Sequence, residues 1–364
     1  MKAIVAKFVE FYERNETKVD LGFFVGGFLF DIVTLSDIDD PLAILQQVVY
    51  LTLIFSILIY DALAAKGRFV VGPKLSKVWQ YRHLALHFIL GSLLSVYSLF
   101  FLKSSSLFTS IIFVLAILGI MIANELSIVQ KGATDLKVAL AVVCLFSFFS
   151  MMFPIALGFV GWVPFLLAAA ATGGVLYGLF CILRRKMEDD RYLLRHLVGP
   201  GTVVILVFFL FYLIGWIPPV PLAIKKLGIY HNVEKIDGNY ILSYQKAWWK
   251  FWQSGAQDFL AEPGDRIYVF VSIFSPTRFD DQVILHWMYK DPKRGWQSTD
   301  RVPLRIVGGR QQGFRGYATK QNFQEGEGRI SVETTDGREI GRIYFEVTRR
   351  PEIDQQRFFE NESY

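Results

Sequence analysis

The sequence contains very little cysteine, and this limits the chemistry open to the chain. Only two of its 364 residues are cysteine, Cys144 and Cys181, and both fall inside apolar stretches. A disulfide framework or a cysteine-based zinc site would need more cysteines, placed in the polar part of the chain. The sequence therefore predicts neither, and we expect no metal and no cofactor.

Short enzyme motifs are also lacking. There is no G-x-S-x-G turn, no glycine-rich phosphate loop and no H-E-x-x-H helix. Charge is nearly balanced, with 38 Lys and Arg against 33 Asp and Glu, an excess too small to predict a nucleic-acid partner. The sequence thus favours a non-enzymatic role without deciding the question.

Long hydrophobic runs fill the first 217 residues. A membrane-spanning helix needs about twenty mostly apolar residues, because lipid offers no hydrogen-bond partner to a bare backbone. We therefore predict a transmembrane domain of about seven α-helices over residues 21–217. The segments are 21–35, 42–65, 84–102, 107–124, 138–157, 162–183 and 201–217. The first is short and contains Asp31, so it either spans the membrane or forms a re-entrant hairpin with the second.

Basic residues between these segments predict the orientation. Lys and Arg of short loops are retained on the cytoplasmic side of a membrane. With the N-terminus inside, sixteen of the Lys and Arg before residue 217 fall in cytoplasmic segments, and Lys103 alone falls in an outer loop. An odd number of helices then places the C-terminal domain outside the cytoplasm, which in a bacterial inner membrane protein means the periplasm.

The first twenty residues show a different pattern. Apolar residues recur there at helical spacing with charges between them, and no signal-peptide pattern is present. We interpret residues 1–20 as an amphipathic cytosolic segment that lies on the lipid bilayer, with an ordinary cytosolic helix as the alternative.

Two groups of polar residues lie near the ends of the apolar segments. At the outer end, Asp31 lies within reach of Gln46 and Gln47, and we interpret this group as a hydrogen-bonding cluster, with a cation or proton site as the alternative. At the inner end lie Asp61, His83, His87 and Glu125. Histidines at a membrane interface usually form hydrogen bonds, so we predict no metal at the inner group, although it is the nearest candidate for a catalytic site.

Beyond Ile217 the composition becomes that of a soluble domain. Seven short runs of β-branched and aromatic residues alternate with Gly, Pro and Asp turns, which predicts an antiparallel β-sandwich of immunoglobulin-like type over residues 218–350, with a small barrel as the alternative. The runs are 240–244, 266–274, 282–289, 302–307, 314–319, 329–334 and 340–347. Asp336-Gly337 predicts a hairpin between the last two. We predict that residues 351–364 form a polar tail.

Candidate ligand-binding residues in this domain are aromatic or basic. The run 247–252 contains Trp248, Trp249 and Trp252, and we favour its docking on the bilayer, or its burial in the domain, over carbohydrate binding. The remaining candidates are His286, Trp287, Arg310 and Arg315. A ligand would be gripped by their polar groups, whereas in the alternative reading Trp287 belongs to the core and the neighbouring glycines only turn the chain.

Three short motifs stand out in the C-terminal domain: His286-Trp287, Gly308-Gly309-Arg310 and Asp336-Gly337. They resemble the pattern of H-x-W followed by GGR and DG in an uncharacterised bacterial family of multi-helix membrane proteins with a C-terminal β-domain. Where the family would have Trp-Arg-Val in the closing strand, this chain has Arg329-Ile330-Ser331-Val332. The resemblance implies the architecture and a bacterial origin, and it supplies no catalytic residues.

Three classes of function remain after this reading. The first is a membrane protein whose periplasmic β-domain binds or scaffolds an envelope protein or glycan. The second is a transporter of a small solute or ion, which the apolar midplane of the helices and the lack of an internal repeat disfavour. The third is a membrane enzyme that acts on lipid-linked substrates. We favour the first, and the oligomeric state stays open.

Overall fold

The structure is a computed structural model that describes residues 38–68, 72, 79, 82–106, 109–124, 134–276, 279–307, 313–349 and 357–364. These residues form two compact units. The helical unit contains the helices up to Ile217, and the β unit contains all the strands together with the segments Lys103–Ile111 and Pro154–Pro164. The predicted segments 1–20 and 21–35 lie outside the described residues, as do Asp31, Glu125 and Arg310.

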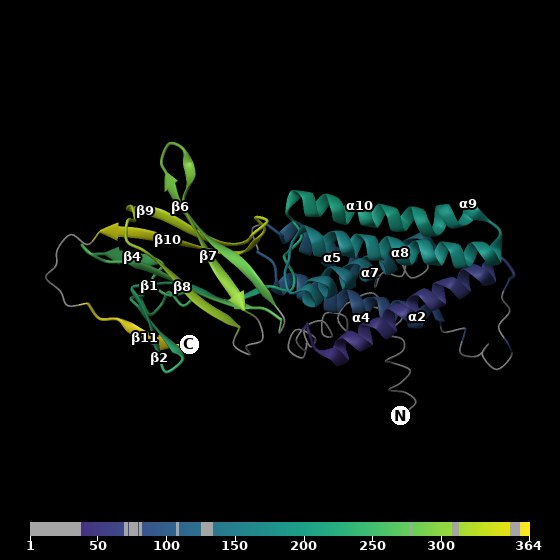
Figure 1. Cartoon of the computed structure of the whole chain (residues 1–364), viewed down its shortest axis with the longest axis horizontal. Helices are drawn as coiled ribbons and strands as arrows, with labels where there is room; N and C mark the ends of the chain where they lie inside the picture. Colours follow the sequence, from purple (N-terminus) through teal and green to yellow (C-terminus); the bar gives the residue numbers. More distant parts are fainter. Residues whose placement is uncertain are drawn as a thin grey trace, which may run out of the picture. The chain divides into compact units, whose positions relative to one another are not determined.

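The helical unit follows the apolar runs of the sequence (Figure 1). Asp40 caps the first described helix by accepting a hydrogen bond from the backbone N–H of Leu42 at 3.0 Å, and the left-handed backbone of Gly215 ends the last one. The helices are α2 (Pro41–Ala65), α4 (Arg82–Lys103), α5 (Ile111–Asn124), α7 (Thr134–Leu157), α8 (Trp162–Met187), α9 (Asp190–Leu193) and α10 (Gly199–Ile214). A short π-helix, η1 (Leu194–Val198), joins α9 to α10.

Among the described residues, five helical segments are long and apolar enough to cross a membrane. They are Pro41–Ala65, Ala85–Lys103, Thr134–Leu157, Trp162–Met187 and Asp190–Ile214, and a shorter apolar helix covers Ile111–Ile120. The predicted number of about seven is therefore not confirmed. The outer surface of this unit is apolar as well, since Val203 and Leu206 on α10 are each 60 % exposed. Such a surface suits lipid better than water.

Aromatic side chains pack the interior of the helical unit. Phe113 of α5 lies 4.8 Å from Phe101 of α4 and 5.8 Å from Phe208 of α10, between ring centroids. Phe208 in turn lies 4.3 Å from Phe146 of α7. These contacts join four helices around one core.

Eleven strands make up the β unit among the described residues. They are β1 (Ala223–Tyr230), β2 (Asn232–Ile236), β3 (Asn239–Tyr244), β4 (Asp258–Ala261), β5 (Ile267–Phe274), β6 (Asp280–Asp291), β7 (Gly295–Val307), β8 (Phe314–Lys320), β9 (Gly326–Thr334), β10 (Glu339–Arg349) and β11 (Glu360–Ser363). All seven strands predicted from the sequence are present. β1, β2, β4 and β11 are additional, and β11 lies inside the predicted polar tail.

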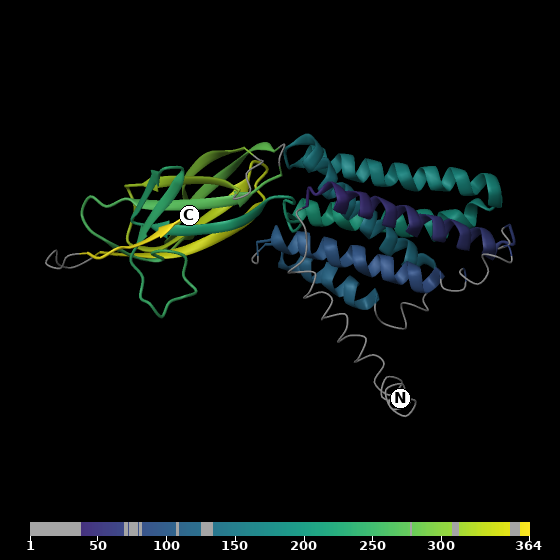
Figure 2. The ribbon, with the colours of Figure 1, turned by 90° about the horizontal axis from the view of Figure 1, so that it is seen from below.

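Three sheets form the layers of this unit (Figures 1 and 2). The sheet β1-β5-β8 and the sheet β4-β10-β9-β6-β7 share one hydrophobic core, to which β5 contributes Val269 and Val271, and β6 contributes Leu285. Phe270, on the opposite face of β5, packs instead with Leu242 of the small sheet β11-β3-β2. The pairing is antiparallel except between β4 and β10, which run parallel. β5 is thus covered on both faces.

The hairpin predicted at Asp336-Gly337 joins β9 to β10. Its loop has three residues, because the N–H of Thr334 donates to the carbonyl of Arg338 at 2.8 Å and that of Gly337 donates to the carbonyl of Thr334 at 3.0 Å. Gly337 supplies the left-handed conformation that such a loop needs, with φ of +85°. The prediction of a hairpin is confirmed.

Two segments that join helices are built into the β unit. The N–H of Val160 donates to Asp281 of β6 at 3.0 Å, and Val160 itself is 5 % exposed within the core shared by the two larger sheets. Ser106 donates to the buried Glu339 of β10, which Arg342 also holds. The β unit therefore includes residues that precede the last helices in the chain.

Candidate functional site

The most exposed aromatic surface of the described chain is the loop between β3 and β4, residues 245–257, called here the aromatic loop. Trp248 is 89 % exposed and Phe251 84 %, and Trp249 and Trp252 are at least half exposed. Burial of these rings in the domain, one of the two arrangements favoured from the sequence, is therefore wrong. The rings gather into one patch, since the centroid of Trp252 lies 5.6 Å from that of Trp249 and 5.2 Å from that of Phe251.

Hydrogen bonds and a close backbone contact hold the aromatic loop in shape. Lys250 pairs with Asp258 at the start of β4 and lies 5.1 Å from the ring centroid of Trp249. Burial alone would raise the pKa of Asp258, but hydrogen bonds from Lys250 and Gln253 outweigh it and hold that pKa below its usual value. At the base, the N–H of Ala256 donates to the carbonyl of Ile229 at 2.7 Å.

Gly255 is required at this base. Its φ is +73°, and a Cβ atom there would lie 2.1 Å from the carbonyl oxygen of Ile229. No other residue type fits this position without moving β1. The loop thus presents its rings from a fixed support, which lowers the conformational entropy that would be lost when they bind a partner.

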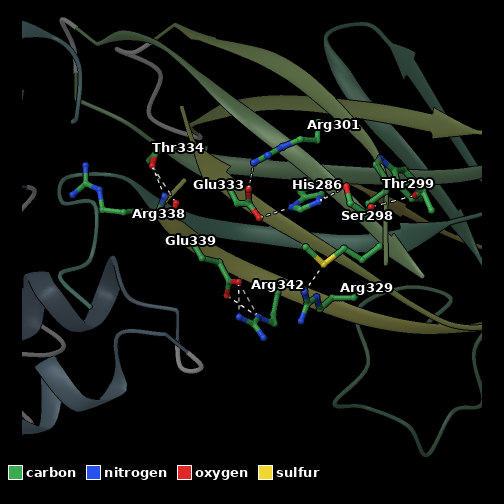
Figure 3. Close-up of polar contacts among 12 residues, drawn as sticks. His286, Ser298, Thr299, Arg301, Arg329, Glu333, Thr334, Arg338, Glu339 and Arg342 are labelled. Carbon is green, nitrogen blue, oxygen red and sulfur yellow. Dashed lines mark hydrogen bonds and ion pairs between the residues drawn. The ribbon is translucent and has the colours of Figure 1, made fainter. Parts of the chain in front are cut away.

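A second candidate is a row of polar residues on one face of the large sheet (Figure 3). The ring of His286 hydrogen-bonds Glu333 through Nδ1 and Ser298 through Nε2, each at 2.8 Å. Arg301 donates to the other oxygen of Glu333, also at 2.8 Å. His286 and Glu333 are both buried.

Strand register explains this row. His286 of β6 pairs with Ser331 of β9 and with Arg301 of β7, so the three side chains share one face. Ser298 would point to the other face if β7 were regular. A bulge opposite Trp287 and Met288 shifts the register by one residue and turns Ser298 toward His286.

The order serine, histidine, glutamate resembles the hydrogen-bonded relay of serine hydrolases. A cavity in the β unit, however, is lined by Trp287, whose side chain lies on the opposite face of β6 from His286, and His286 does not line it. Arg301 also neutralises Glu333, which in a relay would stabilise a positive imidazole. We therefore interpret the row as a structural network that joins β6, β7 and β9.

The structure places the other predicted residues of this unit apart from these two groups. Trp287 is buried, as its reading as a core residue predicted, and it also borders the cavity. Arg315 donates to the carbonyls of Tyr364 at 2.9 Å and Gly238 at 3.1 Å, so it fastens β8 to the small sheet. It lies neither in the polar row nor in the aromatic loop.

The two polar groups predicted in the helical unit are described only in part, because Asp31 and Glu125 lie outside the described residues. Gln47 is buried, whereas Gln46 is exposed on the surface of α2. Asp61 pairs with Arg82 at 2.6 Å. His87 is buried, and the side chain of His83 lies outside the described residues. In the described part of the chain, no group of three His, Cys, Asp or Glu side chains is arranged to hold a metal.

Two polar contacts of the helical unit were not predicted. His196 of η1 pairs with Asp135 of α7, and Lys66 pairs with Asp189 at 2.7 Å. These partners are separated by 61 and 123 positions in the sequence. Each lies where an apolar run begins or ends, and this is the only signal that the sequence offers for them.

One part of the β unit matches a known protein family. Residues 280–347 match a family described as a protein of unknown function (DUF2914). The match spans β6 to β10 and includes His286, Trp287 and Glu333, and it agrees with the expected uncharacterised family with a C-terminal domain. The H-x-W pattern itself does not occur here, since His286 and Trp287 are adjacent.

No curated protein matches the chain. An immunoglobulin-like protein from Pseudomonas aeruginosa is 14 % identical, covers 34 % of this chain and 98 % of its own, and has a TM-score of 0.20. An alkylpurine DNA glycosylase from Pseudomonas fluorescens, bound to DNA with an abasic-site analogue, is 11 % identical, covers 86 % of this chain and 99 % of its own, and has a TM-score of 0.21. Neither TM-score is high enough to support a functional argument.

Proposed function

We propose that the chain is an integral membrane protein whose β unit, a sandwich of immunoglobulin-like type in the periplasm, binds an envelope protein or glycan through the aromatic loop. The observation that carries the proposal is the exposure of four large rings on a support fixed by Gly255. Surface patches of this kind usually mark interaction sites, and Trp is the residue most often found where binding energy concentrates.

The connections between helices support a single outer face. The segments Lys103–Ile111 and Pro154–Pro164 and the chain beyond Ile217 all belong to the β unit. Counted with the shorter apolar helix α5 as a crossing, one, three and five membrane crossings separate the start of α4 from these three segments, so alternating crossings put all three on the same side. The positive-inside rule assigns that side to the exterior, because the basic residues concentrate in the other connections.

Within the β unit, the aromatic loop and the segment that follows α4 lie at opposite ends of β10. Glu339, at one end of β10, hydrogen-bonds Ser106, which lies three residues after α4. Glu346, seven residues along β10, pairs with Asp258 at the base of the aromatic loop. Seven residues of a strand span about 23 Å. The loop therefore starts well away from the segment that leaves α4.

Photo-crosslinking in the intact full-length protein tests this proposal. A benzoylphenylalanine placed at Trp248 is expected to form a discrete adduct with an envelope protein or glycan in living cells. Alanine at Trp249, Phe251 and Trp252 should reduce that adduct by at least about tenfold, because exposed rings contribute to binding and little to folding.

Ile236 provides the matched control position, since it is 50 % exposed on β2 in the same unit. Adducts of equal yield and composition from both positions would reject the aromatic loop as a binding surface. Adducts with lipid alone from Trp248 would support docking on the bilayer and would contradict the proposal.

A further inference from the structure

The β unit contains a cavity of about 190 Å³ at one end of the core between its two larger sheets. Strands β6, β7, β9 and β10 contribute to its wall, and the end of β8 with the following turn closes one side. Trp287 borders it, with its side chain on the face of β6 opposite that of His286. The function proposed above does not use this cavity.

One ion pair stands at the wall of the cavity. Lys320 pairs with Asp300, hydrogen-bonds the hydroxyl of Thr299 at 3.1 Å and lies 5.7 Å from the ring centroid of Trp287. The side chain of Lys320 is only 12 % exposed, whereas that of Asp300 is 46 % exposed. The ammonium is therefore held in place by three neighbours while one edge of the carboxylate faces the solvent.

Amide and aromatic groups complete the wall. Asn322 and Gln324 line it and make no hydrogen bond to another residue in the part of the chain that the structure describes. Phe323, between them, contacts Phe259 edge to face at 5.9 Å. Trp287 meets Phe345 in the same geometry at 6.3 Å. Apolar rings thus lie beside groups that donate and accept hydrogen bonds.

The ion pair in the wall of the cavity favours an uncharged ligand. Lys320 and Asp300 neutralise each other, so an anion would have to displace Asp300 and a cation would have to displace Lys320. A neutral ligand with two adjacent hydroxyls need displace neither, because one hydroxyl donates to the carboxylate and the other accepts from the ammonium. The rings then receive the C–H face of the same molecule.

The size of the cavity limits the ligand further. Pockets for drug-sized molecules usually measure about 300–1,000 Å³, so a cavity of about 190 Å³ holds about one six-membered ring with its substituents. We propose that this cavity is a binding site for a neutral saccharide unit, with Asp300 and Lys320 contacting adjacent hydroxyls and the half-buried Phe323 contacting the ring. The inference goes beyond the proposed function, because it assigns to the β unit a second binding site that shares no residue with the aromatic loop.

Saturation-transfer NMR with the full-length protein tests the site. The protein is purified in a detergent without a sugar head group, and N-acetylglucosamine and glucose are the saccharide probes. We expect transfer from protein to the ring protons of at least one sugar. The double variant Asp300→Asn with Lys320→Met keeps the net charge, and it should weaken that binding by at least about tenfold, the effect of losing a charged hydrogen bond.

The matched control is the double variant Lys290→Met with Glu327→Gln. It removes an ion pair of 2.8 Å between β6 and β9 that does not line the cavity, and it should leave sugar binding unchanged. Alanine at the exposed Asn322 and Gln324 provides a second test that does not depend on the ion pair, and it should also weaken binding.

Three results would overturn the proposal. The first is no saturation transfer to either sugar, and the second is equal transfer in the wild type and in both cavity variants. The third is a loss of transfer in the aromatic-loop variant while the cavity variants keep it. Binding of inorganic phosphate or acetate in preference to the sugars would also contradict the neutral ligand class. The crosslink from Trp248 is measured in a separate experiment. A failure of sugar binding would therefore not contradict the proposed function, and a loss of the crosslink would not affect the test of the cavity.

Discussion

The stability of the β unit should depend on pH through His231, which lies between β1 and β2. Its ring stacks on Phe259 at 4.1 Å and contacts Phe359 at 5.1 Å, between centroids. Neither ring nitrogen has a hydrogen-bond partner among the described residues, and both are buried. Burial, followed by the positive charge of Arg357, lowers the pKa of His231 to about 4, against the smaller opposing effects of Asp265 and Glu262.

The sign and size of the effect follow from this pKa. The unfolded chain has a histidine pKa near 6.5, so it binds a proton more readily than the folded chain between about pH 6.5 and pH 4. The contribution of neutral His231 to stability is therefore complete above about pH 6.5 and is lost as the pH falls through that range. The full difference amounts to about 3 kcal/mol, of which about 2.5 kcal/mol is lost by about pH 4.5.

Calorimetric unfolding of the full-length protein in detergent measures this loss. His231→Phe keeps the aromatic stack and removes the titrating group, so the unfolding free energy of its β unit should fall by about 2.5 kcal/mol less than that of the wild type between about pH 7 and pH 4.5. His286→Gln removes a histidine whose two ring nitrogens are hydrogen-bonded, and it should retain the decline caused by His231. Parallel declines in the wild type and His231→Phe would refute the reasoning.

Two further predictions concern the supports of the β unit. Val160→Ala should lower its unfolding free energy by about 2 kcal/mol through lost core packing, whereas Val163→Ala, at a position that is 55 % exposed, should change it by less than about 0.5 kcal/mol, as measured by calorimetry. Equal effects would show that residues 154–164 do not belong to this core. Gly255→Ala should lower the unfolding free energy of the unit by at least about 2 kcal/mol more than Gly238→Ala does. Both glycines have positive φ, but only a Cβ atom at residue 255 would clash with a backbone oxygen. Thermal unfolding compares the two variants, and equal shifts would exclude the predicted clash.

The sequence predicts the parts of this fold that depend on local pattern. Ile330 and Val332 alternate with polar residues, and Gly337 follows Asp336 in the turn, so the sequence alone predicts β9, β10 and their hairpin. β11 could not, because Glu360–Ser363 has no apolar residue, and the backbone pairing and the hydrogen bond from Ser243 to Asn361 that join it to β3 leave no pattern in the sequence. β1 was missed because its two lysines and a bulge between Ile224 and Lys226 break the alternation.

Sites that depend on register or on distant segments were less accessible. His286 was singled out, but its partner Glu333 is 47 residues away, and Ser298 reaches it only through a bulge that composition does not reveal. The core position of Val160 was equally hidden, since it stands in a short connection between two apolar runs. The aromatic loop could be recognised from its residues, but its exposure could not, because the same rings would also suit a core.

The central claim is that the β unit lies outside the cytoplasm, and cysteine labelling in intact cells tests it most directly. With Cys144 and Cys181 replaced by alanine, a single cysteine is introduced at Lys293, in the exposed turn between β6 and β7, or at Arg68, beyond the end of α2. A membrane-impermeant maleimide should label Lys293→Cys in cells whose outer membrane alone is permeabilised, and should label Arg68→Cys only after lysis. Labelling in the reverse order would place the β unit in the cytoplasm and contradict the account.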